Sequence, residues 1–240
     1  MTLPTSGPIS IGAINSEFGR GNDLGTYRGV RWYKDDNSRG YFDGASGNFA
    51  PTDMSEFYGT RPSIPVSPVS NQSQANGSTY TVPFYNTITV VVTGGAGGQA
   101  GFYGVNGCSG NTPTPSGGGG AGGTSSFGSY VSSSGGSGGG GSGGGGSAGQ
   151  TKTIIFDANA NTVTINGVIQ SGVYPPLKNT SIACTVGAGG AGGGGGTNFA
   201  LIQTGNSGFP NYTPIYTCFA IGNAANGAAG AAGSVILSLT

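Results

Sequence analysis

Apolar and polar side chains alternate most clearly in the last two thirds of the chain, where short β-branched and aromatic stretches stand between blocks of glycine. Alternation with period two and enrichment in Val, Ile, Thr and Tyr predict β-strands. We expect strands at 78–93, 151–170, 180–186 and 234–240, the second of them a hairpin that turns at 157–161. This part of the chain is therefore predicted to be mainly β.

The first 60 residues have a different pattern, which predicts two short helices around a hairpin. Ser10 suits the N-cap of a helix that Gly19 ends, and Ile9 and Ile14 occupy the two positions of a hydrophobic staple. The other expected elements are a second helix capped by Thr52 or Asp53 and ended by Gly59 and Pro62, and hairpin strands near 27–33 and 39–43.

Charge divides the chain into two parts. Thirteen of the 16 charged residues lie in the first 61 positions, whereas 43 of the 53 glycines come after them. The segment 61–68 has three prolines in eight residues, and proline makes a chain extended and stiff. We expect a module at 1–61, a Pro-rich linker at 62–75 and a glycine-rich β domain at 76–240.

Composition disfavours several classes of function. The chain has no histidine, so most hydrolase and metalloenzyme sites lack their usual acid–base group and ligand. The net charge of zero disfavours binding to nucleic acid. No apolar run reaches about 18 residues and the first residues lack the pattern of a signal peptide, so we expect no membrane insertion. We expect no enzyme activity, no cofactor and no metal.

Few residues remain as candidates for chemistry. Asp53 and Glu56 have the spacing of an acid–base pair, but a helix cap explains them better. Asp35, Asp36 and Asn37 offer oxygen ligands without the spacing of a calcium loop, and a turn is the simpler interpretation. The cysteines form no Cys-x-x-Cys pair, which leaves buried thiols or one disulfide with a spare thiol among Cys108, Cys184 and Cys218.

The N-terminal pattern LPTSGPISIGAINSEFG, followed by YRGVRWY and DMSEFYG, resembles a short module found on many tail and tail-fibre proteins of tailed bacteriophages. The resemblance covers about residues 3–60 and implies a role in virion assembly, with the module as anchor and without catalysis. The segment KDDNSRGYFDGASGNFA is more charged than this family's pattern. The residues expected to dock to the particle are Ile9, Ile11, Ile14, Phe18, Arg28, Arg31, Trp32, Tyr33, Met54, Phe57 and Tyr58.

The C-terminal part resembles the glycine-rich domain of phage tail proteins. In that family a strand containing TVP runs into a glycine tract, and the chain ends with a Gly-Ala-Gly segment and an apolar strand. The segment GGGGAGGTSSFGSYVSSSGG also fits the family, whereas the hairpin at 151–170 does not and is interpreted as an insertion.

So much glycine needs a compensating source of stability. A penalty of about 0.5 to 1 kcal/mol for each glycine would exceed the net stability of a typical domain several times over. Extended threefold helices without Cβ atoms can approach closely enough for backbone hydrogen bonds between neighbours. We expect packed polyglycine-II helices, within one chain or across an oligomer. The block 135–149 would span roughly 46 Å as one such helix, or serve as a flexible linker.

The segments between the glycine blocks are uncharged and aromatic. Tyrosine among Ser, Gly and Asn is also typical of antibody contact loops, and loops on a rigid scaffold often carry binding residues. The alternative for each aromatic side chain is a place in the core. The candidates for receptor binding are Phe102, Tyr103, Phe127, Tyr130, Phe199, Phe209, Tyr212 and Tyr216.

Together these features predict a non-enzymatic phage virion protein, assembled in the host cytoplasm. The module would attach to other tail or baseplate proteins, and the glycine-rich domain would bind a glycan or protein on the host surface as a fibre or tip adhesin. Phage fibres are commonly trimers, so a homotrimer is expected. The alternatives are a capsid decoration or tail-tip protein without receptor recognition, and a non-viral glycine-rich matrix protein.

Overall fold

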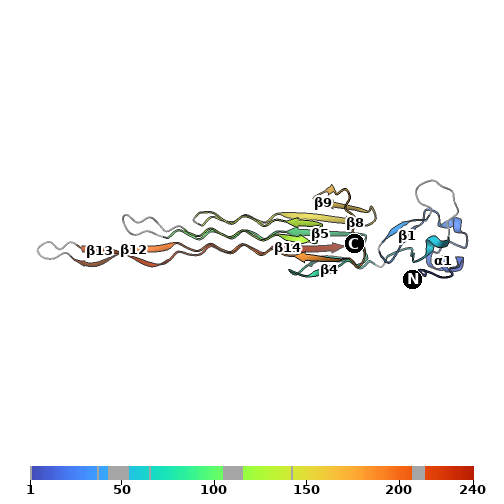
Figure 1. The fold of residues 1–240 in the computed structure, drawn as a ribbon, viewed down its shortest axis with the longest axis horizontal. Coiled ribbons are helices and arrows are strands. Elements are labelled where there is room, and N and C mark those ends of the chain that lie inside the picture. Colours follow the sequence, from blue (N-terminus) through green and yellow to red (C-terminus); the bar gives the residue numbers. More distant parts are fainter. Residues whose placement is uncertain are drawn as a thin grey trace.

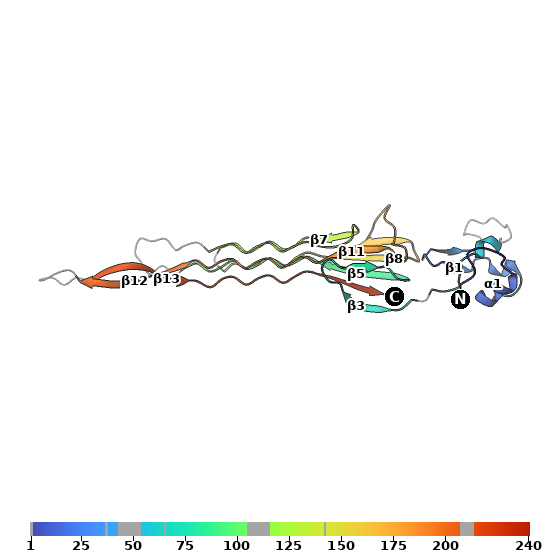
Figure 2. The ribbon, with the colours of Figure 1, turned by 60° about the horizontal axis from the view of Figure 1, so that its bottom comes forward.

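The computed structural model describes residues 2–36, 38–42, 54–64, 66–104, 116–141, 143–206 and 214–240. The molecule is elongated, with the N-terminal module at one end, two packed sheets next to it, and glycine-rich runs that lead to a β-hairpin at the other end (Figures 1 and 2). It is mainly β, with 33% strand and 8% helix, and its sheets are antiparallel. The mainly β fold expected from the sequence is confirmed at this level.

The N-terminal module is built around a small aromatic core. Helix α1 (Ile11–Phe18) begins after Ser10, whose hydroxyl accepts the Ala13 N–H, and ends at Gly19 with a φ of 69°. Three further pieces follow: the 3-10 helix η1 (Leu24–Tyr27), the hairpin of β1 (Arg31–Tyr33) and β2 (Arg39–Tyr41), and the 3-10 helix η2 (Met54–Phe57). The second helix expected from the sequence is thus a single 3-10 turn, and its expected caps Thr52 and Asp53 lie outside the described residues.

Two antiparallel sheets pack face to face next to the module. The larger has the order β10 (Val168–Ile169), β9 (Thr162–Ile165), β8 (Thr151–Asp157), β5 (Thr87–Thr93), β14 (Ser234–Leu239) and β3 (Val69–Ser73). The smaller has the order β4 (Thr79–Thr81), β11 (Ser181–Thr185), β6 (Ser125–Phe127) and β7 (Val131–Ser133). Alternate residues of β5 and β14 are buried between the sheets, as period two requires. We call this pair of sheets the sandwich.

The strands differ from the sequence-based expectation at two places and agree with it at a third. The stretch 78–93 is divided into β4 and β5, which belong to different sheets, with Pro83 in the break between them. The segment expected as a linker at 62–75 contains β3, which pairs with β14. The turn at 157–161 lies where it was expected, and the Asp157 carboxylate holds it by accepting the N–H groups of Asn159 and Ala160.

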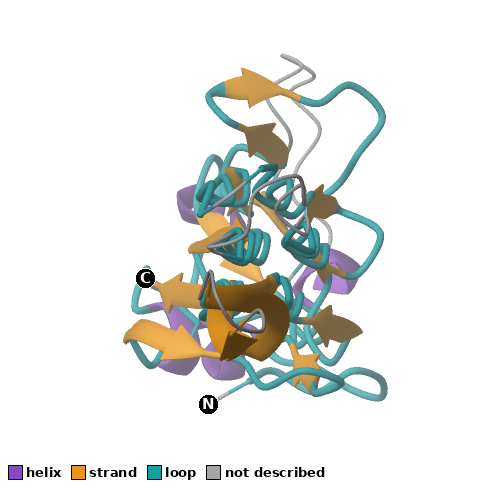
Figure 3. Ribbon diagram, turned by 90° about the vertical axis from the view of Figure 1, so that its left-hand side faces the viewer, coloured by secondary structure: helices purple, strands orange, loops and turns teal. Residues whose placement is uncertain are grey.

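Six glycine-rich runs extend from the sandwich in the direction of the far hairpin, and together we call them the glycine shaft. They are 94–104, 116–124, 134–141, 143–150, 186–196 and 224–233, and none has regular strand pairing in the described residues. Seen along the long axis they form coils that lie side by side (Figure 3). Run 94–104, the central run, makes backbone hydrogen bonds to each of the other five.

The hydrogen bonds of the central run repeat every three residues. Gly94, Gly95 and Ala96 donate in turn to Gln150, Gly123 and Ala231, and the next three residues donate to Ser147, Gly120 and Ala228 of the same three runs. These N···O distances lie between 2.8 and 2.9 Å. Each set of three residues therefore presents one N–H group to each of three neighbouring runs, all within one chain.

The close approach of the runs explains why glycine fills them. A Cβ on Gly97 would lie 1.9 Å from Ser137 O, and one on Gly98 would lie 2.0 Å from Ala191 O. In run 224–233 only every third residue, Gly227, Gly230 and Gly233, faces a neighbour, and the alanines between them are exposed. In this run alanine thus stands where the chain faces outward, and glycine stands where an added Cβ would meet another backbone.

The block 135–149 is part of this shaft. Its two runs bond to each other, with the Ser147 N–H donating to Ser137 O at 2.9 Å, and to the central run through Gly136 and Gly139. The chain therefore reverses within the block, and the expectation of one straight helix about 46 Å long is wrong. The expectation of a flexible linker does not fit this hydrogen bonding either.

Candidate functional site

The end of the molecule far from the module is a two-stranded ribbon, which we call the distal hairpin. It consists of β12 (Thr197–Asn206) and β13 (Pro214–Asn223), paired antiparallel. Five consecutive pairs, from Phe199 with Ala220 to Gln203 with Tyr216, lie between two register shifts. The ribbon leaves the shaft between runs 186–196 and 224–233, so the position of the hairpin is set by two hydrogen-bonded runs.

The distal hairpin exposes apolar side chains on both faces. Because directly paired residues lie on the same face, Leu201 and Tyr216 belong to one face, and Ile202 and Phe219 to the other. These four side chains and Ile221 are between 45% and 60% exposed. An exposed apolar surface of this kind indicates an interaction site.

The hairpin and its surroundings carry no charge. Beyond Lys178 the sequence contains no charged residue, so both strands and the whole of run 186–196 are neutral. Hydrogen bonds within the ribbon are also between neutral groups, such as the contact of 2.9 Å between the Thr204 and Thr217 hydroxyls. The site can therefore make apolar contacts and neutral hydrogen bonds, and none of its side chains is an Asp, Glu, Lys or Arg.

The residues expected to bind a receptor fall into four groups, the last of them in the sandwich. Tyr216 on the hairpin, and Phe102 and Tyr103 at the end of the central run, are exposed. Phe199 is half-buried on β12. Phe209 and Tyr212 lie outside the described residues.

Two of the expected receptor contacts lie in the sandwich. Phe127 is fully buried in the core, 6.2 Å from the Phe156 ring centroid, so its assignment to a recognition loop is wrong. Tyr130 is half-buried and packs edge-on against Phe156 at 4.9 Å. The turn between β6 and β7 thus completes the core at a point remote from the hairpin.

Sequence reasoning missed the residues that contribute most of the exposed apolar surface at the distal hairpin, namely Leu201, Ile202, Phe219 and Ile221. The signal that could have found them is the strand-like composition of FALIQT and IYTCFAI, two stretches expected to be loops with aromatic residues. The cysteines match the second of the two alternatives, one disulfide with a spare thiol, since Cys184 is a free buried thiol and Cys218 on β13 is disulfide-bonded.

The residues expected to dock to the particle are mostly used within the module. Ile14, Phe18 and Phe57 are buried in its core, and Phe18 and Phe57 meet edge to face at 5.9 Å, so their assignment as docking residues is wrong. Ile9, Ile11, Trp32 and Met54 pack partly buried against the same core. The Tyr58 hydroxyl donates to Gly7 O. Arg28 is exposed, and Tyr33 lies beneath the guanidinium groups of Arg31 and Arg39.

Arg31 and Arg39 join the module to the sandwich. Arg39 donates to Tyr85 O at 2.8 Å, Asn159 Oδ1 at 2.7 Å and Asn86 Oδ1 at 3.4 Å, and Arg31 donates to Asn159 O at 3.3 Å. Burial lowers the pKa of Arg39 and raises the pKa of Tyr85. These contacts border a cavity of about 270 Å³. Arg31 was expected to contact the particle, but its guanidinium is directed at this chain's own second half.

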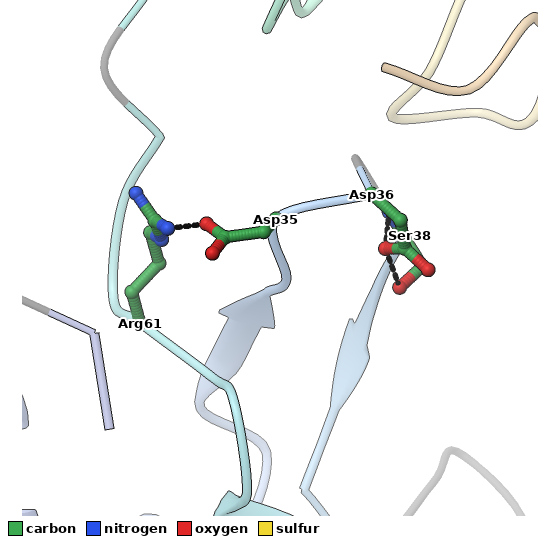
Figure 4. Close-up of polar contacts among 4 residues, drawn as sticks. All are labelled: Asp35, Asp36, Ser38 and Arg61. Carbon is green, nitrogen blue, oxygen red and sulfur yellow. Dashed lines mark hydrogen bonds and ion pairs between the residues drawn. The ribbon is translucent and has the colours of Figure 1, made fainter. Parts of the chain in front are cut away.

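A second set of contacts surrounds Phe84 and the start of the linker. The Arg61 guanidinium lies 5.1 Å and the Lys178 ammonium 4.1 Å from the centroid of the Phe84 ring. Arg61 also forms an ion pair with Asp35 (Figure 4). The Lys178 N–H donates to Asp36 O. The module and the sandwich are therefore joined by several contacts besides the chain itself.

The acidic residues considered as calcium ligands have other roles. Asp35 pairs with Arg61, while Asp36 Oδ1 accepts both the N–H and the hydroxyl of Ser38 (Figure 4). Burial by itself would raise the pKa of Asp36, but the hydrogen bonds from Ser38 outweigh it and hold that pKa below its usual value. Asn37 lies outside the described residues.

In the described part of the chain, no group of three His, Cys, Asp or Glu residues is placed to hold a metal ion. The same residues include no helix with the length and apolar character needed to cross a bilayer. Comparison of the chain with protein-family models, with curated proteins and with solved structures found no match.

Proposed function

We propose that this chain is a non-enzymatic structural protein of a bacteriophage tail, a fibre or tip adhesin whose module attaches to the particle and whose distal hairpin binds the host surface. The observation that carries the proposal is the difference between the two ends of the molecule. Its charged module lies at one end, and an uncharged, apolar hairpin lies at the other end of a hydrogen-bonded shaft. The resemblance of both halves to phage tail proteins supports the same function.

The glycine shaft consists of polyglycine-II helices in this proposal. Such helices have three residues per turn and no internal hydrogen bonds, so their N–H groups point outward at intervals of 120°. The threefold alternation of acceptors along the central run fits this geometry. A rigid shaft of this kind would hold the hairpin away from the particle, where it can reach a host cell.

The proposed partners are tail or baseplate proteins at the module and a glycan or protein of the host surface at the hairpin. We further propose a homotrimer, as in many phage fibres, which would place three distal hairpins near one another. Assembly would take place in the host cytoplasm, and the mature location would be the virion.

A second candidate is a capsid decoration or baseplate protein without receptor recognition. One observation favours it: Val168 and Ile169 on β10 are 63% and 67% exposed, and Tyr174 nearby in the sequence is 66% exposed. This apolar surface lies on the sandwich and not at the far end, so a neighbouring virion protein that covered it would hold the chain along its side.

Deletion of residues 199–221 tests the adhesin function. The cut removes the hairpin beyond the Asn198–Gly222 pair and leaves all six runs of the shaft. Phage that carry the deletion should assemble and contain the shortened chain, but should not adsorb to host cells. Normal adsorption by such particles would contradict the adhesin function and favour the second candidate.

A further inference from the structure

The two sheets of the sandwich differ in width at one edge. Strand β7 is the last strand of the smaller sheet and packs over β5 and β8, whereas the larger sheet continues from β8 to β9 and β10. Ile165 on β9 pairs with Ile154, which is fully buried in the core, so both side chains lie on the inner face of the larger sheet. Ile165 is only half-buried, and it lines a cavity of about 350 Å³ together with residues of β7, β8 and the turn before β7. This volume lies within the range of small-molecule sites, about 300–1,000 Å³.

Lys152 contributes a positive charge to this cavity. It pairs on β8 with Val92, whose side chain is fully buried between the sheets, so Lys152 projects from the inner face. Its ammonium has no ion-pair or hydrogen-bond partner in the part of the chain that the structure describes. Asp157 is the only acidic residue after position 61, and it lies five residues further along β8, on the opposite face. A half-buried charge without a counter-charge loses hydration with no return, so this lysine is available for an anionic ligand.

Hydroxyl groups accompany the charge. Tyr130 lines the same cavity, and its ring packs edge-on against Phe156 at 4.9 Å, which fixes its position. Its hydroxyl has no hydrogen-bond partner among the described residues, and burial raises its pKa, so it stays protonated and can donate near neutral pH. Ser129 and Ser132 are exposed and line the cavity as well. The cavity therefore combines one cation, three hydroxyl-bearing side chains and the apolar side chain of Ile165.

From these observations we infer that this cavity, which we call the Lys152 site, binds a carboxylated sugar of the hexuronic acid kind. Lys152 would pair with the carboxylate, Tyr130 and the two serines would exchange hydrogen bonds with the sugar hydroxyls, and Ile165 would contact the apolar part of the ring. One cation matches the single charge of a carboxylate. A phosphate group carries about −1.5 to −2 at pH 7 and is commonly bound by arginine or a helix N-terminus, and neither lines this cavity. The site lies in the sandwich, so the inference does not depend on the adhesin function of the distal hairpin.

The first test is isothermal titration calorimetry of the full chain with sodium glucuronate. For a ligand of about 13 non-hydrogen atoms we expect a dissociation constant on the order of 1 mM. Glucose has a hydroxymethyl group in place of the carboxylate and should bind at least about tenfold more weakly, because it cannot make the charge-assisted contact with Lys152. Equal affinity for glucose and glucuronate, or binding of neither, would overturn the inference.

Variants of the chain assign the binding to the Lys152 site. Lys152→Met removes the charge, keeps a long apolar side chain and should abolish measurable binding of glucuronate. Tyr130→Phe keeps the ring against Phe156 and should weaken binding about three- to tenfold through the lost hydroxyl. The matched control, Lys178→Met, removes one lysine charge at the junction with the module and should bind like the unchanged chain. Far-ultraviolet circular dichroism of all three variants should match the unchanged chain. A correctly folded Lys152→Met variant that binds glucuronate as tightly as the unchanged chain would overturn the inference.

Two further ligands distinguish the source and the kind of anion. In methyl glucuronide the anomeric oxygen is blocked, as it is in a polysaccharide. Binding of methyl glucuronide with the affinity of glucuronate would support the inference with a sugar unit of an acidic glycan as the ligand, and binding of glucuronate alone would support it with a free sugar acid. Tighter binding of inorganic phosphate than of glucuronate would overturn the assignment of the site to a carboxylate.

Discussion

The substitution Gly97→Ala tests the packing of the glycine shaft most sharply. Its Cβ would lie 1.9 Å from Ser137 O, whereas ordinary contact begins at about 3.4 Å, so the central run and run 134–141 would have to separate by about 1.5 Å. That movement would break the hydrogen bonds from Gly136 to Gly95 and from Gly139 to Gly98, now 2.8 and 2.9 Å long.

The magnitude follows from those two bonds. A buried backbone group left without a partner costs about 1–3 kcal/mol. Alanine also lowers the entropy of the unfolded chain, which returns about 0.4–1 kcal/mol. The net loss should be roughly 1–6 kcal/mol, and for a chain of this size it should lower the Tm by roughly 2–24 °C.

The matched control is Gly145→Ala. Gly145 belongs to run 143–150, is exposed, and has no atom within 4 Å of an added Cβ. Its Tm should stay the same or rise slightly, because only the unfolded chain is affected. Differential scanning calorimetry of both variants measures the difference. Equal Tm values for Gly97→Ala and Gly145→Ala would refute the packing argument.

Three other variants test separate parts of the structure. Arg39→Ala removes the donors to Tyr85 O and Asn159, so limited trypsin digestion after Lys178, whose N–H donates to Asp36 O of the module, should become several-fold faster, whereas the exposed Arg28→Ala should leave it unchanged. Gln99 donates to Gly143 O and accepts the Ala228 N–H, so Gln99→Ala should speed amide hydrogen exchange of the shaft, as mass spectrometry would detect. Burial raises the pKa of Tyr80 to about 12, above its unfolded value of 10, so stability should be full below about pH 10 and fall as the pH rises towards 12. In urea titrations at pH 8 and 11, the Tyr80→Phe variant should lose less of its free energy of unfolding between the two pH values than the unchanged chain. Because the buried Tyr80 hydroxyl has no hydrogen-bond partner, the variant should be as stable as the unchanged chain, or more stable, at neutral pH.

Strands with one buried face could be predicted from the sequence. In β5 and β14 the apolar residues alternate with threonine and serine because one face packs into the sandwich. The distal hairpin gives no such alternation, since Leu201 and Ile202 are neighbours that face opposite sides and both are exposed. Strand β3 was missed because its polar residues form a strand only through pairing with β14.

The close packing of glycine-rich runs could be predicted from the sequence, but the order in which the runs lie next to one another could not. Close backbone packing follows from the excess of glycine, yet the sequence does not distinguish which run neighbours which, because glycine residues have no side chains to specify partners. The docking residues show a related limit. The sequence does not distinguish whether Phe18 and Phe57 are buried in the module core or exposed for docking. No motif pointed to Arg39, which donates a hydrogen bond to Asn159, 120 residues away in the sequence.

Immunogold labelling of intact phage particles would show where on the virion this chain lies, and so tests the proposed position at the tail. The antibody should recognise the glycine-rich domain, residues 76–240, and the particles should be those that contain this chain. For a fibre or tip adhesin we expect a few gold labels per particle, at the distal end of the tail. Labels at many sites over the head would contradict the account, since the chain would then be a decoration protein and the distal hairpin a contact between virion proteins.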